Sequence, residues 1–184
     1  MPGAIVASGE RVALRTSETE DIPFLQRAGA NPEIRIPLGG PLLNREQYEI
    51  SDDRTAPDRF LVCLDGDGAS PGRPSEDDVT PIGRVSVVDA HYKRPELGYW
   101  LVPEYHGEGY GKEAVALVID YVLRTHNTPA VEAEAFDFND ASRGLLESLG
   151  FTEEGRKRKF MFVDGAYRDM IQYGLLREEW HESV

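Results

Sequence analysis

Three glycines occur at alternate positions, Gly107, Gly109 and Gly111, where an apolar strand gives way to a long apolar helix. Glycine lets the backbone bend freely and lets a ligand approach the bare chain. The first N–H groups of a helix have no intrahelical partner, and the helix dipole places partial positive charge on them. This arrangement predicts an anion site, most often for a phosphate group.

Two common phosphate-binding loops can be tested against this spacing. A Walker loop would need glycine at position 106 and serine or threonine at position 113, where the chain has His106 and Glu113. A dinucleotide loop starting at Gly109 meets Ala114 at its sixth position, which is a tolerated variant. It also needs an acidic residue after a second strand, about 20 residues later. No second strand is evident in the right place, which weakens the dinucleotide interpretation but leaves it open.

The segment from His106 to Gly111 resembles the coenzyme A pyrophosphate loop of the GNAT N-acetyltransferases, usually written Gln/Arg-x-x-Gly-x-Gly/Ala. The chain departs from this pattern at His106, the usual Gln or Arg position, and at Glu108, where a basic residue is common. Residues 11–34 and 139–180 resemble the RimJ/RimL type, the branch that acetylates the N-termini of ribosomal proteins. The resemblance covers nearly the whole chain.

This resemblance implies a fold and a co-substrate. The fold is an α/β (α+β mixed-sheet) acyl-coenzyme A N-acyltransferase domain, with a mostly antiparallel sheet, splayed central strands and helices on both faces. Acetyl-coenzyme A would lie between the strand that ends at Val102 and the strand that ends near Phe138, and backbone N–H groups near Leu101 and Val102 would face the thioester. The residues implied to bind the coenzyme are Leu101, Val102, His106, Gly107, Glu108, Gly109, Tyr110, Gly111, Lys112 and Asn139.

The resemblance also aligns Glu96 with the glutamate that many relatives use as the general base. Burial beside Tyr99 and Trp100 would raise the pKa of Glu96 toward the operating pH. The alternative is a solvated carboxylate at the start of a strand, and His91 and His106 are rival bases.

Ser142 matches a serine that RimL-type relatives place near the coenzyme sulfur, where it donates to the thiolate, and Asn139 matches an asparagine that binds the pantetheine arm. The alternative for both is helix capping, with Asn139 as the N-cap and Ser142 as an ordinary first-turn residue. Other side chains that could donate to the sulfur are Tyr105, Tyr110 and Tyr167.

Composition limits the remaining choices. A chain of 184 residues can bury a sizeable core, and we expect one domain over residues 1–184. We find no membrane-spanning stretch, no signal peptide and no metal-ligand spacing. The lone Cys63 lies in an apolar strand and is expected to be a buried small side chain. A reducing cytoplasm is the expected compartment.

The net charge of −13 argues against nucleic acid as a partner. Acidic surplus with only four lysines is typical of proteins that are soluble in strong salt, so a halophilic source is one hypothesis and an ordinary acidic protein is the other. The basic run at residues 156–159 is interpreted as a solvated hairpin face, and Lys112 as the better phosphate ligand.

Periodicity and turn residues predict a mixed sheet with helices on both sides. The expected strands are 11–16, 59–64, 82–89, 96–102 and 131–138, followed by a hairpin of 151–163 and 166–176 across Asp164-Gly165. The expected helices are 19–28, 44–54, 109–125 and 141–149, the last one closed by Gly150. Residues 65–81 are expected to form a mobile loop, and they are the main part that the resemblance does not cover.

The resemblance implies an N-acetyltransferase that moves an acetyl group directly from acetyl-coenzyme A to an amine, and the residue spacing predicts no metal. The acceptor would be a protein N-terminal α-amino group or a small amine. The alternatives are a coenzyme A-binding regulatory module without catalysis and, less well supported, a nucleotide-binding domain. The resemblance leaves a homodimer open.

Overall fold

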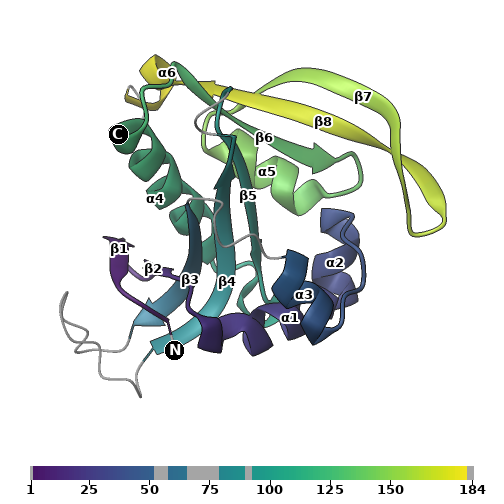
Figure 1. Cartoon of the computed structure of the whole chain (residues 1–184). Coiled ribbons are helices and arrows are strands. Elements are labelled where there is room, and N and C mark those ends of the chain that lie inside the picture. The colour runs from purple at the N-terminus through teal and green to yellow at the C-terminus, as the bar shows by residue number, and fades with distance from the viewer. Residues whose placement is uncertain (1, 52–57, 66–78, 90–92, 182–184) are drawn as a thin grey trace.

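The computed structural model describes residues 2–51, 58–65, 79–89 and 93–181 and is built on one eight-stranded sheet (Figure 1). The strands lie in the order β1-β2-β3-β4-β5-β6-β8-β7, and every neighbouring pair is antiparallel except β5 and β6. Their bounds are β1 Ile5–Ser8, β2 Ala13–Thr16, β3 Arg59–Asp65, β4 Val79–Val88, β5 Glu96–Leu101, β6 Ala130–Phe136, β7 Thr152–Val163 and β8 Ala166–Leu176. The predicted mostly antiparallel mixed sheet is confirmed.

The two parallel strands at the centre separate soon after they begin. Their register contains only two pairs, Glu96 with Glu132 and Leu97 with Ala133, although β5 continues to Leu101 and β6 to Phe136. We call the region beyond these pairs the β5–β6 divergence. The predicted splay of the central strands is therefore confirmed, and it frees backbone groups that a ladder would otherwise occupy.

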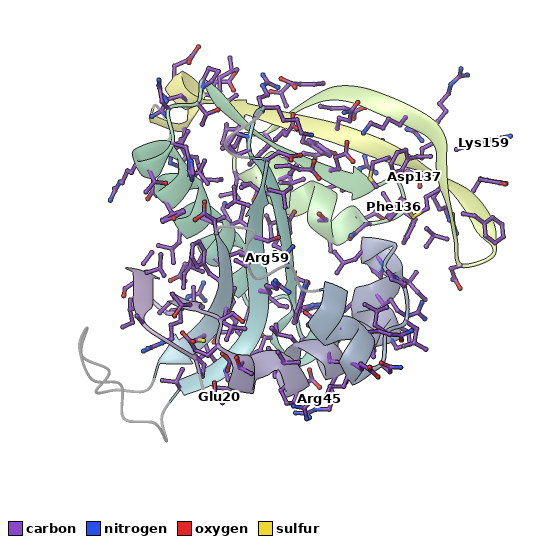
Figure 2. The ribbon with its side chains drawn as sticks, viewed as in Figure 1. Glu20, Arg45, Arg59, Phe136, Asp137 and Lys159 are labelled. Carbon is purple, nitrogen blue, oxygen red and sulfur yellow. The ribbon has the colours of Figure 1, made fainter. Side chains whose placement is uncertain are left out.

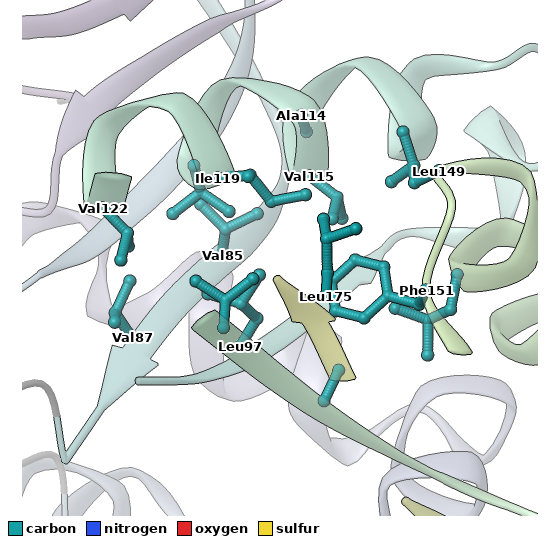
Figure 3. Close-up of a cluster of buried hydrophobic side chains, with 14 of the residues drawn as sticks. Val85, Val87, Leu97, Ala114, Val115, Ile119, Val122, Leu149, Phe151 and Leu175 are labelled. Carbon is teal, nitrogen blue, oxygen red and sulfur yellow. The ribbon is translucent and has the colours of Figure 1, made fainter. Parts of the chain in front are cut away.

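Helix α4 (Tyr110–Thr125) and helix α5 (Asp140–Ser148) pack on one face of the sheet (Figure 3). Buried residues recur along α4 at helical spacing, so one side of the helix is apolar. They are Ala114, Val115, Val118, Ile119, Val122 and Leu123. Burying each larger aliphatic side chain stabilises the fold by about 1.5–3 kcal/mol. This packing fixes the start of α4, and with it the glycine loop, against the end of β5.

The opposite face of the sheet carries α1 (Ile22–Ala30), α2 (Pro32–Leu38) and α3 (Arg45–Ser51), which gather at the lower right in Figure 1. Leu25 of α1 packs against Leu61 and Cys63 of β3, and Cys63 is fully buried, as predicted. The remaining elements are the short 3₁₀ helices η1 (Thr19–Asp21) and η2 (Pro103–Tyr105) and the C-terminal α6 (Arg177–His181). None of the described helices is long and apolar enough to cross a membrane.

The β7–β8 hairpin extends away from the rest of the sheet (Figure 1). Asp164 and Gly165 have φ angles of 47° and 80°, so both central residues of the turn are left-handed, as a type I′ turn requires. The predicted turn is confirmed. Figure 2 places Lys159 on the outer part of this hairpin.

Besides the short η2, three elements, β1, α2 and α6, were not predicted from the sequence. Helix α2 nevertheless has a local start signal, because the Asn31 side chain accepts from the Glu33 N–H at 3.0 Å and Pro32 follows the cap. The predicted helix over 44–54 has the expected cap, since Asn44 and Gln47 bond reciprocally, but only its part up to Ser51 is described. Most of the predicted mobile loop, residues 66–78, lies outside the described residues.

Candidate active site

The glycine loop turns the chain from η2 into α4, and residues 106–109 are all exposed. Gly107 and Gly109 have φ angles of 82° and 84°, which side chains with a Cβ rarely adopt. Gly111 serves differently, because a Cβ there would lie 3.2 Å from Leu145 Cδ1 of α5. The loop therefore presents bare backbone and helix-start N–H groups, as an anion site requires.

The backbone at the end of β5 corrects one prediction. The Val102 N–H donates to the Ile82 carbonyl at 2.8 Å, so it faces β4, and the predicted donor role of this N–H toward the coenzyme is wrong. Because N–H groups alternate in direction along a strand, the Leu101 N–H faces the β5–β6 divergence. His106 Nε2 lies 2.9 Å from the Leu101 carbonyl oxygen, so this ring helps to fix the end of β5.

The other loop residues occupy distinct positions around the start of α4. Lys112 is exposed in the first turn of α4, where an anion would meet it. Tyr110 packs against Tyr105, with ring centroids 6.2 Å apart, and Glu108 is exposed.

Helix α5 begins beside the divergence with the predicted cap. Asn139 Oδ1 accepts from the Ser142 N–H at 3.2 Å, which confirms the capping interpretation of Asn139. Ser142 does more than occupy the first turn, because its Oγ lies 2.7 Å from the hydroxyl of Tyr99 on β5. This hydrogen bond joins the two elements that border the divergence.

Tyr99 was not predicted from the sequence as a donor to the sulfur. Burial raises its pKa to about 12, although its hydrogen bond with Ser142 acts in the other direction. The alternation of Leu97, Tyr99 and Leu101 along β5 puts Tyr99 on the face that α4 and α5 cover, so strand periodicity was the available signal. Of the predicted rivals, Tyr167 is 65% exposed in the hairpin.

Glu96 begins β5 and projects from the opposite face of the sheet, and 33% of its side chain is exposed. Its Oε2 lies 3.7 Å from Lys93 Nζ. Burial raises the pKa of Glu96, the negative charges of Glu134 and Glu132 raise it further, and the nearby Lys93 and Lys157 lower it. The rival base His91 lies outside the described residues.

Two pockets flank Glu96 on this face of the sheet. The first, of about 300 Å³, is called the arginine-lined pocket and includes Gly98 and Tyr99, the residues where β5 leaves β6. Its lining residues are Leu38, Tyr48, Arg59, Arg84, Ser86, Gly98, Tyr99 and Trp100. Figure 2 shows Arg59 near the centre of the sheet.

The second pocket, of about 190 Å³, is called the glutamate-lined pocket. Its lining residues are Glu132, Ala133, Glu134, Glu154, Gln172 and Tyr173. Lys157 pairs with Glu134, Arg94 with Glu154 and Lys93 with Glu132, so all three carboxylates have cationic partners.

The basic run on β7 is largely a solvated face, as predicted, but two of its charges are paired. Arg156 Nε lies 2.7 Å from Asp169 Oδ2, and Lys157 pairs with Glu134. The register of β7 with β8 is also irregular between Lys157 and Met161, so simple alternation does not describe this segment.

A domain model described as acetyltransferase (GNAT) domain matches residues 11–152, which is most of the chain. The chain belongs to the GNAT acetyltransferase family. A similar protein, the SPbeta prophage-derived uncharacterized N-acetyltransferase YokL of Bacillus subtilis, is 35% identical over 94% of both chains. The glycine loop, the divergence and the cap of α5 thus lie in a fold that uses acetyl-coenzyme A to acetylate amines.

Two further relatives of this GNAT protein have named acceptors. The [Ribosomal protein uS5]-alanine N-acetyltransferase of Escherichia coli is 30% identical over 58% of this chain and 56% of its own length. The crystal structure of spermidine N-acetyltransferase from Vibrio cholerae, in complex with CoA and spermine, superposes with a TM-score of 0.77 at 21% identity and covers 94% of this chain and 99% of the other. These acceptors differ in size and charge.

Proposed function

We propose that this protein transfers the acetyl group of acetyl-coenzyme A directly to an amine, with the reaction at the β5–β6 divergence. The observation that carries the proposal is the 2.7 Å contact between the Tyr99 hydroxyl and Ser142 Oγ. It is a preorganised pair of hydroxyls at the point where two strands part. Charge that develops in the transition state is best stabilised by donors fixed in advance.

In this proposal the coenzyme is held by backbone rather than by side-chain charge. The N–H groups of the glycine loop and the first turn of α4 would bind the diphosphate, and Lys112 adds a positive charge in that turn. Asn139 uses its side-chain oxygen as the α5 cap, so its amide nitrogen is the group left to bind the pantetheine arm.

The acceptor nitrogen attacks the thioester carbon, the C–N bond forms, and the C–S bond breaks with its electron pair on sulfur. Ser142 donates a hydrogen bond to the leaving thiolate, and Tyr99 donates to Ser142. Because the Tyr99 pKa of about 12 lies above that of an ordinary thiol, near 8.5, the pair stabilises the thiolate and Tyr99 keeps its proton. The thiolate takes its proton from water as coenzyme A leaves.

Glu96 is the proposed general base. Its raised pKa matches it better to an α-amino group, whose pKa is near 8, than an ordinary carboxyl would be. It lies on β5 two residues before Gly98, on the same face as the arginine-lined pocket. Direct transfer is supported because the only cysteine of the chain, Cys63, is fully buried beneath α1.

We propose the arginine-lined pocket as the acceptor site, because Gly98 and Tyr99 connect it to the divergence. A volume of about 300 Å³ suits a small amine or the first residues of a peptide. The RimJ/RimL resemblance and the uS5-alanine relative support a protein N-terminal α-amino group as the acceptor.

The test is an acetylation assay that follows thiol release, with acetyl-coenzyme A and a panel of N-terminal peptides, amino acids and spermidine. Ser142→Ala and Tyr99→Phe should each lower kcat about tenfold or more with any active acceptor. Tyr167→Phe, which removes an exposed hydroxyl on the hairpin, is the matched control. Coenzyme binding with no turnover of any acceptor would instead indicate a coenzyme-binding module without catalysis.

A further inference from the structure

The turn between β1 and β2 packs against the start of α4, about a hundred residues later in the chain. Three donors from this turn converge on the Glu113 carboxylate. They are the Arg11 N–H at 2.7 Å, the Val12 N–H at 3.2 Å and the Arg11 Nε at 3.1 Å. The same guanidinium donates from Nη1 to the Glu108 carbonyl oxygen at 2.7 Å. Arg11 thus bonds the loop and the first turn of the helix together.

The position of the Glu113 carboxylate is unfavourable for binding an anion at the glycine loop. It lies in the first turn of α4, beside the N–H groups that would bind phosphate, and an unpaired carboxylate there would repel an anion. Partial burial acts to raise its pKa, but the hydrogen bonds from the Arg11 and Val12 N–H groups and from the Arg11 side chain outweigh it and lower the pKa. Glu113 is therefore ionised, and Arg11 balances its charge.

The bond to the Glu108 carbonyl controls the direction of a loop donor. In a trans peptide the C=O of one residue and the N–H of the next point in opposite directions. While Arg11 holds the Glu108 oxygen, the Gly109 N–H must point away from Arg11, out of the exposed loop. Arg11 also lies over the Tyr110 ring, 4.9 Å from its centroid, which limits its own movement.

We propose that Arg11 is a positioning residue for the diphosphate of the coenzyme, supplying from outside the loop the cation that the loop lacks at Glu108. It holds the loop N–H groups toward the ligand and cancels the charge of Glu113. The inference rests on the proposed use of the glycine loop for coenzyme A.

The experiment is calorimetric titration of the full chain with coenzyme A and with dephospho-coenzyme A, which keeps the diphosphate but lacks the 3′-phosphate. Arg11→Met should weaken both ligands by about tenfold. Glu113→Gln alone should not weaken either, and Arg11→Met with Glu113→Gln should recover part of the loss, since the repulsive charge is gone. Arg124→Met, at the exposed far end of α4, is the control and should bind like the wild type.

Equal affinity of Arg11→Met and the wild type would overturn the inference, and so would a loss confined to coenzyme A, since that would assign Arg11 to the 3′-phosphate. If Arg11→Met does not fold, Arg11→Lys tests the same point. Lysine keeps the positive charge but lacks the planar guanidinium that bonds the Glu113 carboxylate and the Glu108 carbonyl oxygen together. The affinity of Arg11→Lys should lie between that of the wild type and a value about tenfold weaker, and wild-type affinity would again overturn the inference. Failure of the wild type to bind coenzyme A would remove the proposed function itself.

Discussion

The arginine-lined and glutamate-lined pockets lie on the same face of the sheet, with Glu96 between them, yet the charged side chains that line them are of opposite sign. Glu96 is two residues from Gly98 of the first pocket along β5 and directly opposite Glu132 of the second on β6. Among the described residues, the first pocket is lined by two arginines and no carboxylate, and the second by three glutamates and no cation. A net charge of −13 therefore says little about the surroundings of a bound acceptor.

This difference suggests that the two pockets have different roles. The first pocket reaches the divergence through Tyr99, so it suits the acceptor, whereas the second acts on Glu96 through the field of its carboxylates. The named acceptors of the two relatives also differ in charge, since spermidine is a polycation and an N-terminal alanine has one amine. A polycation would favour the glutamate-lined pocket, so acceptor preference is a readout of which pocket is used.

The largest effect should come from the residue between the pockets. Glu96→Gln removes the proposed base but keeps the size of the side chain, and we expect kcat to fall by about a hundredfold or more with every acceptor. Steady-state kinetics at saturating acetyl-coenzyme A would measure it. The matched control is Glu178→Gln, an exposed glutamate of α6. An unchanged kcat would mean that water or another group removes the proton.

A matched pair of glycines tests which pocket holds the acceptor. A Cβ at Gly98 would project beside Ser86 Oγ, at 2.9 Å, in the arginine-lined pocket, and a Cβ at Gly174 would meet Glu154 Cδ at 2.4 Å beside the other pocket. In both positions the neighbour is a side chain that can move. We expect Gly98→Ala to raise the acceptor KM about tenfold with little change in kcat, and Gly174→Ala to leave it unchanged.

The reverse result, a raised KM for Gly174→Ala alone, would move the acceptor to the glutamate-lined pocket and favour a cationic substrate. Adding Ser86→Ala to Gly98→Ala removes the clash and keeps the methyl group. If the raised acceptor KM of Gly98→Ala comes from a distorted strand, Ser86→Ala should restore it. If it comes from a methyl group that fills the pocket, Ser86→Ala should not.

These pockets also mark the limit of what the sequence could predict. The glycine loop, the Asn139 cap and the Asp164-Gly165 turn were predicted because each depends on residues within a few positions of one another. The splay of β5 and β6 came from a family resemblance. Tyr99 was missed as a partner of Ser142 because the two are 43 residues apart, although strand alternation gave its face.

Arg11 left no comparable signal, because nothing in its local sequence relates it to Glu108 or Glu113. The Val102 prediction failed for a related reason. Which way an N–H faces depends on the register with β4, and the sequence does not state that register. Local chemistry was therefore predictable here, whereas groups brought together by the sheet were not.

A smaller effect should distinguish the two pockets by how their charged residues shift the pKa of Glu96. Removing the negative charge of Glu134 with Glu134→Gln should lower the pKa of Glu96, and removing the positive charge of Lys157 with Lys157→Met should raise it. The acidic limb of kcat/KM against pH reports this pKa, so it should move to lower pH in the first variant and to higher pH in the second. Arg59→Met, in the arginine-lined pocket, should leave the acidic limb in place. If the acidic limb moved in the same direction in Glu134→Gln and in Lys157→Met, the assignment of this pKa to Glu96 would be refuted.

The smallest effect concerns stability at alkaline pH, to which Tyr99 of the arginine-lined pocket should contribute. The pKa of Tyr99 is raised from 10 to about 12 in the folded state, so above pH 10 the unfolded chain loses this proton first. Stability should therefore fall as pH rises from 10 toward 12, with a contribution from Tyr99 on the order of 1 kcal/mol by pH 11. Tyr99→Phe removes that contribution, so its free energy of unfolding should fall less than that of the wild type between pH 9 and 11. Denaturant unfolding at both pH values measures the difference, with Tyr167→Phe as the exposed control, and equal losses in wild type and Tyr99→Phe would show that the Tyr99–Ser142 pair is not shielded from water as the structure has it.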